Sequence, residues 1–346
     1  PRPVPPSSGP GSHLMGGPPA VESGTGWVLL LIVVGLVVLA VGAELVVHGA
    51  SRLAGRLGVS PMIIGLTVVS ITTSTPELAV GIGAARVGAG DIAVGNIAGT
   101  NAVNLLLILG LSALIRPLRL HARTLRGDLP LMAAAAAALL LAAVDGLISR
   151  LDGALLLAVA VVYTAVNIRA SRRERARVRA EYEAEDSPPD RRPSPASTAL
   201  DLLGLLAGVA VVTVGAEWLV TGAVEFAERR GVSDAVIGLT IVAIGTSAPE
   251  IATMISATVH DRRDVAVGNL IGSSVYNLTL ILPMVALVIP LPVTEELVRV
   301  DLPVMAAATL ACVPVFMGDR RVTRLEGGLF VLAYAGYLAY LLVART

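Results

Sequence analysis

The stretch GLTVVSITTSTPE at residues 65–77 returns as GLTIVAIGTSAPE at residues 238–250, 173 positions later. The same offset aligns residues 41–104 with residues 214–277 without a gap, and 32 of the 64 aligned positions are identical. Identity at half of the positions exceeds what a shared apolar composition supplies. The chain therefore contains an internal duplication.

The composition around this repeat is that of an integral membrane protein. Hydrophobic residues make up 55% of the 346 residues and charged residues 15%, whereas soluble proteins carry about 25% charged residues. The formal net charge is zero, so there is no bulk attraction to nucleic acid or to anionic lipid. Cys312 is the only cysteine, which excludes an internal disulfide. A cytosolic enzyme, a disordered chain and a nucleic-acid-binding protein are all excluded.

The pattern of apolar stretches predicts an all-α membrane protein with ten transmembrane helices, because ten stretches approach the length that a bilayer core of about 30 Å requires. They lie near residues 27–47, 61–85, 92–115, 129–144, 151–168, 202–224, 235–259, 265–290, 302–318 and 326–343.

Between and before these helices lie two polar segments. Residues 1–25 are rich in Pro, Gly and Ser and are predicted to be disordered, with GSHLM typical of an expression-tag remnant. We expect a first five-helix unit at residues 26–169, an arginine-rich loop at 170–198 and a second five-helix unit at 199–346. The first half of the loop has the mixed charges of a solvated helix.

The arginines predict the orientation of the chain. With the N-terminus outside, the five cytoplasmic loops hold 19 of the 26 arginines. We therefore expect both termini outside the plasma membrane and the loop at residues 170–198 in the cytoplasm. Since each unit has an odd number of helices, the two repeats are predicted to be inverted, as in secondary transporters with an ion site between the repeats.

Two glutamates lie in the middle of predicted helices, in TSTPE at 73–77 and TSAPE at 246–250. The preceding proline removes a backbone N–H and frees a carbonyl oxygen four residues earlier, so both helices are expected to break here. No arginine lies at this depth of the helices, so the carboxylates of Glu77 and Glu250 must bind a cation or hold a proton. Glycine-mediated helix packing would explain a repeat, but not an acid at the same depth in both copies.

The second element of each copy is GNxxG[ST]xxxN. Thr100 and Asn104 are four residues apart, as are Ser273 and Asn277, so each pair is expected on one helix face. Together with the glutamates they offer oxygen atoms only, which hard cations such as Ca²⁺ and Na⁺ prefer. Interhelical hydrogen bonding is the alternative role for the two asparagines.

Four further polar residues in the predicted helices are assigned structural roles. Asn96 and Asn269, early in the second element, lie nearer the helix ends, which favours packing or capping. Glu44 and Glu217 come late in their helices and are expected to reach the membrane interface or to tether a loop.

These paired motifs resemble the alpha repeats of the sodium/calcium exchanger family, within the cation/calcium exchanger superfamily, over residues 27–343. The resemblance implies alternating access, in which Na⁺ flows in to drive Ca²⁺ out. It implies that backbone carbonyls of Ser70 and Ala243 face Na⁺. It places the other ion ligands at Thr73, Ser74, Glu77, Thr100 and Asn104, and at Thr246, Ser247, Glu250, Ser273 and Asn277.

Asn277 is the main departure from related sequences, because some prokaryotic members and the potassium-dependent branch carry Asp there. An amide leaves two formal charges at the site and predicts K⁺-independent exchange. Two carboxylates cannot neutralise more than two Na⁺, so transport of more than two Na⁺ per Ca²⁺ would be electrogenic. We predict an antiporter rather than an enzyme, with no cofactor and no obligate protein partner. Its partners are Ca²⁺, Na⁺ and the lipid bilayer.

Three alternatives remain open. The first is a Ca²⁺/H⁺ antiporter, in which Glu77 and Glu250 carry protons, although the hydroxyl-rich helix breaks favour Na⁺. The second is a cation channel, which fits paired acids at one enclosed site less well. The third is an intramembrane serine protease, but Ser74 and Ser247 have no histidine or lysine in the membrane to act as a base.

Overall fold

The computed structural model describes residues 25–57, 59–119, 127–184, 195–231, 243–317 and 321–344. The predicted disordered segment at residues 1–25 lies almost wholly outside them. The elements of the first copy are α1 (Thr25–Leu57), α2 (Pro61–Ile64), η1 (Gly65–Val69), α3 (Ser70–Thr73), α4 (Thr75–Arg86), α5 (Gly90–Ala102), η2 (Val103–Ile108), α6 (Leu109–Ile115), β1 (Leu118–Arg119), α7 (Leu129–Ala142), β2 (Leu147–Ile148) and α8 (Arg150–Ala184).

The second copy repeats this order of elements. They are α9 (Pro195–Arg229), α11 (Ala243–Thr246), α12 (Ala248–Val259), α13 (Arg263–Tyr276), η5 (Asn277–Ile281), α14 (Leu282–Val288), β3 (Leu291–Pro292), η6 (Leu297–Asp301), α15 (Leu302–Met317), β4 (Arg321–Val322) and α16 (Arg324–Ala344). The helix α8 continues to Ala184, in agreement with the solvated helix predicted for the start of the arginine-rich loop.

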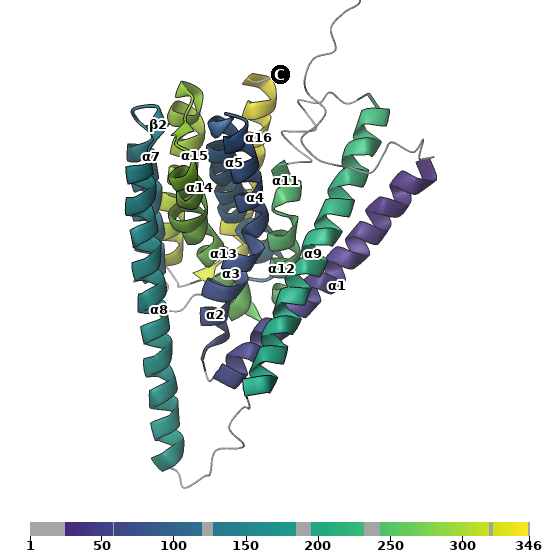
Figure 1. Ribbon diagram of the computed structural model, residues 1–346. Coiled ribbons are helices and arrows are strands. Elements are labelled where there is room, and N and C mark those ends of the chain that lie inside the picture. The colour runs from purple at the N-terminus through teal and green to yellow at the C-terminus, as the bar shows by residue number, and fades with distance from the viewer. Residues whose placement is uncertain are drawn as a thin grey trace, which may run out of the picture.

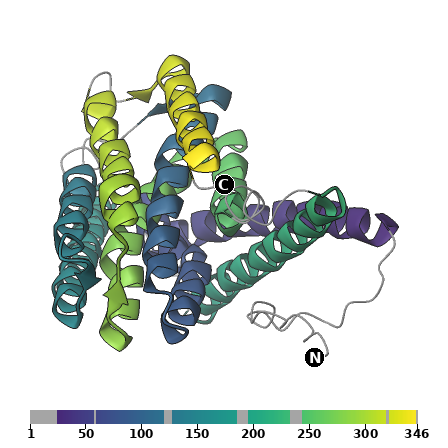
Figure 2. The same cartoon turned by 90° about the horizontal axis from the view of Figure 1, so that it is seen from above.

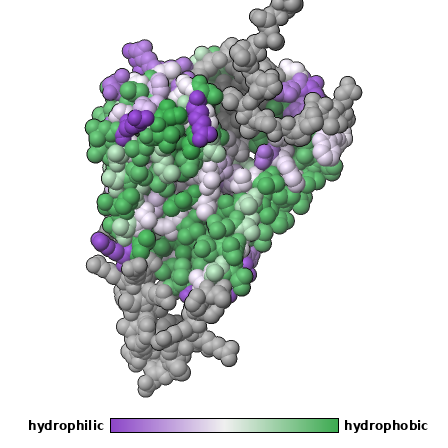
Figure 3. All heavy atoms as spheres, in the orientation of Figure 1, coloured by the Kyte–Doolittle hydropathy of each residue, from purple (hydrophilic) through white to green (hydrophobic). Residues whose placement is uncertain are grey.

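Eight helical segments within the described residues are long and apolar enough to cross a membrane. The chain is therefore a multi-pass membrane protein, and its flanks are largely apolar (Figure 3). Two of the ten predicted helices are not among the eight. Helix α7 has only 14 residues, and the helix predicted at 235–259 begins in residues 232–242, outside the described part.

Helices α1 and α9 lie side by side as a slanted pair beside the main bundle (Figures 1 and 2). Glycines recur every seven residues along both: Gly35, Gly42 and Gly49 in α1, and Gly208, Gly215 and Gly222 in α9. A Cβ atom on Gly42 would lie 2.3 Å from the backbone nitrogen of Val212, and one on Gly215 would lie 2.3 Å from that of Leu39. The two backbones approach this closely only because these positions lack side chains.

Two short antiparallel ladders join the copies, and the all-α prediction missed both. Strand β1 pairs with β4, and β2 pairs with β3. Each ladder therefore links a connection of the first copy to one of the second. Strands of two residues are too short to show an alternating hydrophobic pattern, so the sequence does not predict them.

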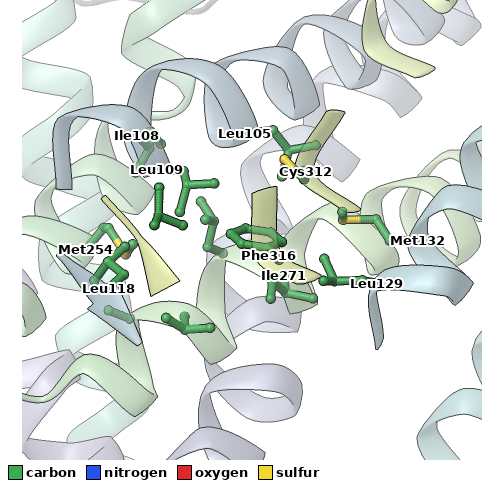
Figure 4. Close-up of a cluster of buried hydrophobic side chains, with 14 of the residues drawn as sticks. Leu105, Ile108, Leu109, Leu118, Leu129, Met132, Met254, Ile271, Cys312 and Phe316 are labelled. Atoms are coloured by element: carbon green, nitrogen blue, oxygen red, sulfur yellow. The ribbon is translucent and has the colours of Figure 1, made fainter. Parts of the chain in front are cut away.

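Two hydrophobic clusters enclose the middle of the bundle. Along the segment 61–86, Leu66 belongs to the first cluster and Ala85 to the second. Along α13 and α14, Ile271 belongs to the first and Leu282 to the second. Figure 4 shows the first cluster, gathered around Phe316. The polar motif residues lie on these helices at the boundary between the clusters.

Candidate ion-binding site

The chain turns out of helical geometry at the two predicted helix breaks. Ser74 separates α3 from α4 with φ −84° and ψ 9°, and Ser247 separates α11 from α12 with φ −90° and ψ 7°. Both values fall in the bridge region between helix and strand. Proline occupies the second position of the helix that follows each break, where its missing N–H costs no helical hydrogen bond.

The two glutamates occupy the first turn of these new helices, Glu77 in α4 and Glu250 in α12. The N-terminus of a helix carries a partial positive charge that favours a carboxylate. Their side chains are 1% and 2% exposed, respectively. The break therefore supplies part of the electrostatic compensation that a buried acid needs, which a continuous helix would not provide.

The asparagines of the second element lie in π-helical turns, Asn104 in η2 and Asn277 in η5. Such turns are rare and recur at functional sites. Helix α4 packs against η5, and α12 packs against η2, so each glutamate-bearing helix meets the asparagine-bearing turn of the other copy. Each asparagine, four residues after its Thr or Ser, therefore lies where the helix widens into a π-helical turn. Sequence periodicity does not reveal this widening.

Most of the predicted site residues are buried, at the two helix breaks and along the two GNxxG[ST]xxxN elements. The buried ones are Ser70, Thr73, Ser74, Glu77, Thr100, Asn104, Ser247, Glu250, Ser273 and Asn277. Thr246 is half-buried. Ala243 is the first residue of α11, and its side chain lies outside the described part. The Ser70 carbonyl accepts the N–H of Ser74 at 3.1 Å and faces the hydroxyl of Thr73 at 3.4 Å.

The two carboxylates are close enough to repel one another. Neither accepts a hydrogen bond of normal geometry within the described residues, although the Thr73 side chain interacts with the carboxylate of Glu250. The side-chain oxygens of Ser74, Thr100, Asn104, Ser247 and Asn277 are also buried without a hydrogen-bond partner there.

Such a concentration of unpaired oxygen atoms is exceptional, because buried polar atoms are nearly always hydrogen-bonded. Hard cations could satisfy oxygen atoms of this kind, because Ca²⁺ takes about 6–8 oxygen ligands. No group of three or more His, Cys, Asp or Glu side chains suited to a metal occurs in the described residues. A cation bound here would be held by two carboxylates and neutral oxygen atoms.

Comparison with known proteins decides the family. The profile described as "Sodium/calcium exchanger protein" matches residues 27–169 and 200–343, and so covers both copies of the repeat. The chain belongs to the sodium/calcium exchanger family. The family is one of transporters, and its members include cation/Ca²⁺ antiporters.

Relatives of the exchanger family match this chain over nearly its full length. The sodium/calcium exchanger MaX1 of Methanosarcina acetivorans is 31% identical over 343 residues, which cover 90% of this chain and 97% of MaX1. The inner membrane protein YrbG of Escherichia coli is 35% identical over 315 residues, covering 90% and 94% of the two chains. A structure of the sodium-calcium exchanger NCX_Mj, soaked with Na⁺ and Sr²⁺, superposes with a TM-score of 0.76 at 29% identity, covering 90% and 97%.

Asn269, for which packing or capping was predicted, packs against residues of the candidate site. Asn269 is 1% exposed and contacts the hydroxyls of Thr73 and Ser273, at 3.3 Å and 3.4 Å from its Oδ1. The helix α13 crosses α3 closely, which brings the early part of the GNxxG[ST]xxxN motif level with the helix break. Position along an apolar stretch does not reveal such a crossing.

Asn101 is another buried amide that the sequence interpretation missed. Its Nδ2 donates to the Ser274 carbonyl at 3.5 Å, and its Oδ1 accepts from Asn277 Nδ2 at 3.5 Å. Asn101 and Ser274 are equivalent positions of the repeat. Alignment of the two copies could have identified this pair, because both positions carry polar residues inside apolar stretches.

Glu44 and Glu217 lie away from the ion site. Glu217 is exposed. Glu44 accepts a hydrogen bond from Ser256 at 2.9 Å, and its carboxylate lies 3.1 Å from His48 and 3.3 Å from His260. Glu44 thus connects α1 to the end of α12, in accordance with the expected tethering role.

Two further buried acids were missed, Asp128 and Asp301. They open the stretches DLPLMAAA and DLPVMAAA, which are again 173 residues apart. Each accepts a hydrogen bond from a tyrosine of the last long helix of its own copy, Tyr163 in α8 and Tyr337 in α16. The repeat therefore extends beyond residue 104, and extending the alignment would have found both aspartates.

Proposed function

We propose that this exchanger moves Ca²⁺ against Na⁺ across the plasma membrane by alternating access. The observation that carries the proposal is the buried set of unpaired oxygen atoms around Glu77 and Glu250. An all-oxygen shell with two negative charges suits Ca²⁺ and Na⁺ better than it suits transition metals. The name of MaX1 as a sodium/calcium exchanger supports the same pair of ions.

The ligands in this proposal are the side-chain oxygens of both motifs, with the carbonyls of Ser70 and Ala243 for Na⁺. Asn277 fits this role, since its Nδ2 donates to Asn101 while its Oδ1 has no partner in the described part of the chain. The remaining ligands are Thr73, Ser74, Glu77, Thr100 and Asn104, and Thr246, Ser247, Glu250 and Ser273.

The two negative charges of the site support both the coupling of Na⁺ transport to Ca²⁺ transport and electrogenic exchange. Two carboxylates balance one Ca²⁺, whereas three Na⁺ would leave one positive charge. Both ions require the same oxygen atoms, so occupancy by one excludes the other. Exchange of three Na⁺ for one Ca²⁺ would move net charge across the membrane. The arginine distribution supports an orientation with both termini outside.

Uptake of radioactive calcium into proteoliposomes tests this function. Gradients of Na⁺, K⁺ and H⁺ are imposed in turn, with the membrane potential clamped and then released. We expect uptake to follow the Na⁺ gradient and to respond to the potential. Uptake that follows only the H⁺ gradient would establish the Ca²⁺/H⁺ alternative, which the two unpaired carboxylates also support. Single-channel currents would establish a channel.

Acidification is expected to inhibit Ca²⁺ transport even when Na⁺ is the coupling ion. A proton on Glu77 or Glu250 removes one of the two charges that Ca²⁺ needs, and burial favours the neutral acid. The initial rate of calcium uptake is measured between about pH 8 and about pH 5, a range that extends toward the ordinary pKa of glutamate. A rate that stays constant over this range would contradict a carboxylate site accessible to protons.

The unchanged protein is expected to need no K⁺, whereas Asn277→Asp is expected to become K⁺-sensitive or more sensitive to pH. The substitution adds a third carboxylate to the site. Like charges at short range cannot all stay ionised at low cost, so the site would take up a proton or another monovalent cation. Na⁺-dependent calcium flux is measured with and without K⁺ at two pH values. A K⁺ requirement in the unchanged protein would show that Asn277 does not decide this property.

A further inference from the structure

Asn269 lies between two hydroxyl groups of the ion site. Its Oδ1 faces the hydroxyl of Thr73 from the first copy of the repeat and that of Ser273 from the second. All three side chains are buried. These residues form what we call the Asn269 triad.

An amide oxygen only accepts hydrogen bonds, so the Asn269 Oδ1 offers an acceptor for the single hydrogen of each hydroxyl. The Thr73 hydroxyl has a second acceptor, the Ser70 carbonyl at 3.4 Å. A hydroxyl binds a cation through its lone pairs, and its hydrogen must point elsewhere. When an ion is bound, Asn269 can therefore take the hydrogens of Thr73 and Ser273 and leave their lone pairs for the ion.

The offset of 173 residues defines an equivalent Asn96 triad, made of Asn96 and Thr100 from the first copy and Thr246 from the second. The Nδ2 of Asn96 and the hydroxyl of Thr100 are both buried without a hydrogen-bond partner in the described residues. The contact between Asn269 and Ser273 is thus present, whereas the equivalent contact between Asn96 and Thr100 is absent among the described residues. The two copies differ in this contact although both carry the motif.

Ser70 lies beside the Asn269 triad. Its hydroxyl is 3.0 Å from the backbone carbonyl of Asn269 in α13 and 2.6 Å from that of Gly65, and its single hydrogen serves one of them at a time. Gly272 permits this approach, since a Cβ there would lie 2.2 Å from the Ser70 Oγ. The second copy has Ala243 in place of Ser70 and cannot form the same bond.

We propose that Asn269 and Asn96 are positioning residues for the transported cation and that they act in turn. Asn269 orients the hydroxyls of Thr73 and Ser273 in the state described, and Asn96 orients those of Thr246 and Thr100 when the site faces the other side. This inference rests on the proposed function and deepens it. Alternating access moves one part of an inverted-repeat transporter against the other around a fixed site, so one triad opens as the other closes.

Calcium self-exchange in proteoliposomes with uniformly oriented protein tests the inference, because it needs neither a Na⁺ nor an H⁺ gradient. The Ca²⁺ concentration for half-maximal exchange is measured at each face of the membrane. Asn269→Leu, which keeps the size but removes the acceptor, is expected to raise this concentration about tenfold or more at one face. Asn96→Leu is expected to do so at the opposite face.

Glu217→Gln, at an exposed position of α9, is the matched control and is expected to remain within about threefold of the unchanged protein at both faces. The thermal unfolding midpoint of each variant separates misfolding from a change in binding. If Asn269→Leu does not fold, Asn269→Ala takes its place and must show the one-sided shift. Equal shifts at both faces, or no shift in either asparagine variant, would overturn the inference. Absence of any calcium exchange in the unchanged protein would count against the proposed function instead.

Discussion

Glu77→Gln and Glu250→Gln are each expected to reduce Ca²⁺ transport at least about 100-fold, which corresponds to about 3 kcal/mol of binding free energy. Each change halves the formal negative charge that faces a divalent ion, while the amide preserves the shape of the side chain. The folded protein is expected to remain stable, because a neutral amide removes the repulsion between the two buried carboxylates and the cost of burying a charge.

The measurement is the initial rate of calcium uptake by purified protein in proteoliposomes, together with the thermal unfolding midpoint. Glu217→Gln is the matched control, because Glu217 is a membrane-helix glutamate that lies exposed on α9. It is expected to transport at the unchanged rate. A normal rate in Glu77→Gln or Glu250→Gln would remove that residue from the set of ligands.

The sequence predicts the site better than it predicts the boundaries of the helices. A repeated acid after a repeated proline, TSTPE and TSAPE, has few physical explanations inside a membrane. It located both helix breaks, at Ser74 and Ser247. The π-helical turns at Asn104 and Asn277 were not predicted, because their formation depends on packing against other helices rather than on a local residue pattern.

Helix crossings account for the main contact at the site that the sequence did not reveal. Asn269 and Asn96 occupy equivalent positions of the repeat, and the sequence gives no reason to treat them differently. Only the approach of α3 to α13, through Gly272 and the Ser70 hydroxyl, brings Asn269 to Thr73. Contacts between residues about 200 positions apart cannot be read from the hydropathy of either segment.

Gly215→Leu is expected to destabilise the protein by about 3 kcal/mol or more and to abolish transport with it. A Cβ on Gly215 would lie 2.3 Å from the backbone nitrogen of Leu39 and 2.7 Å from its Cα. No rotamer of the new side chain relieves a collision with backbone, so α1 and α9 must separate. The measurements are the unfolding midpoint in detergent and the monodispersity of the purified protein.

Alanine substitutions on α9 test whether an added Cβ lowers or raises the unfolding midpoint. Gly215→Ala adds only the colliding carbon and is expected to lower the unfolding midpoint. Gly204 lies on the same helix, α9, and no heavy atom is within 4 Å of a Cβ added there. Intrinsic helix propensity favours alanine over glycine by about 1 kcal/mol, so Gly204→Ala is expected to leave the midpoint unchanged or to raise it. If Gly215→Ala also raised the midpoint, helix propensity would outweigh packing there, and the close approach of α1 to α9 would be wrong.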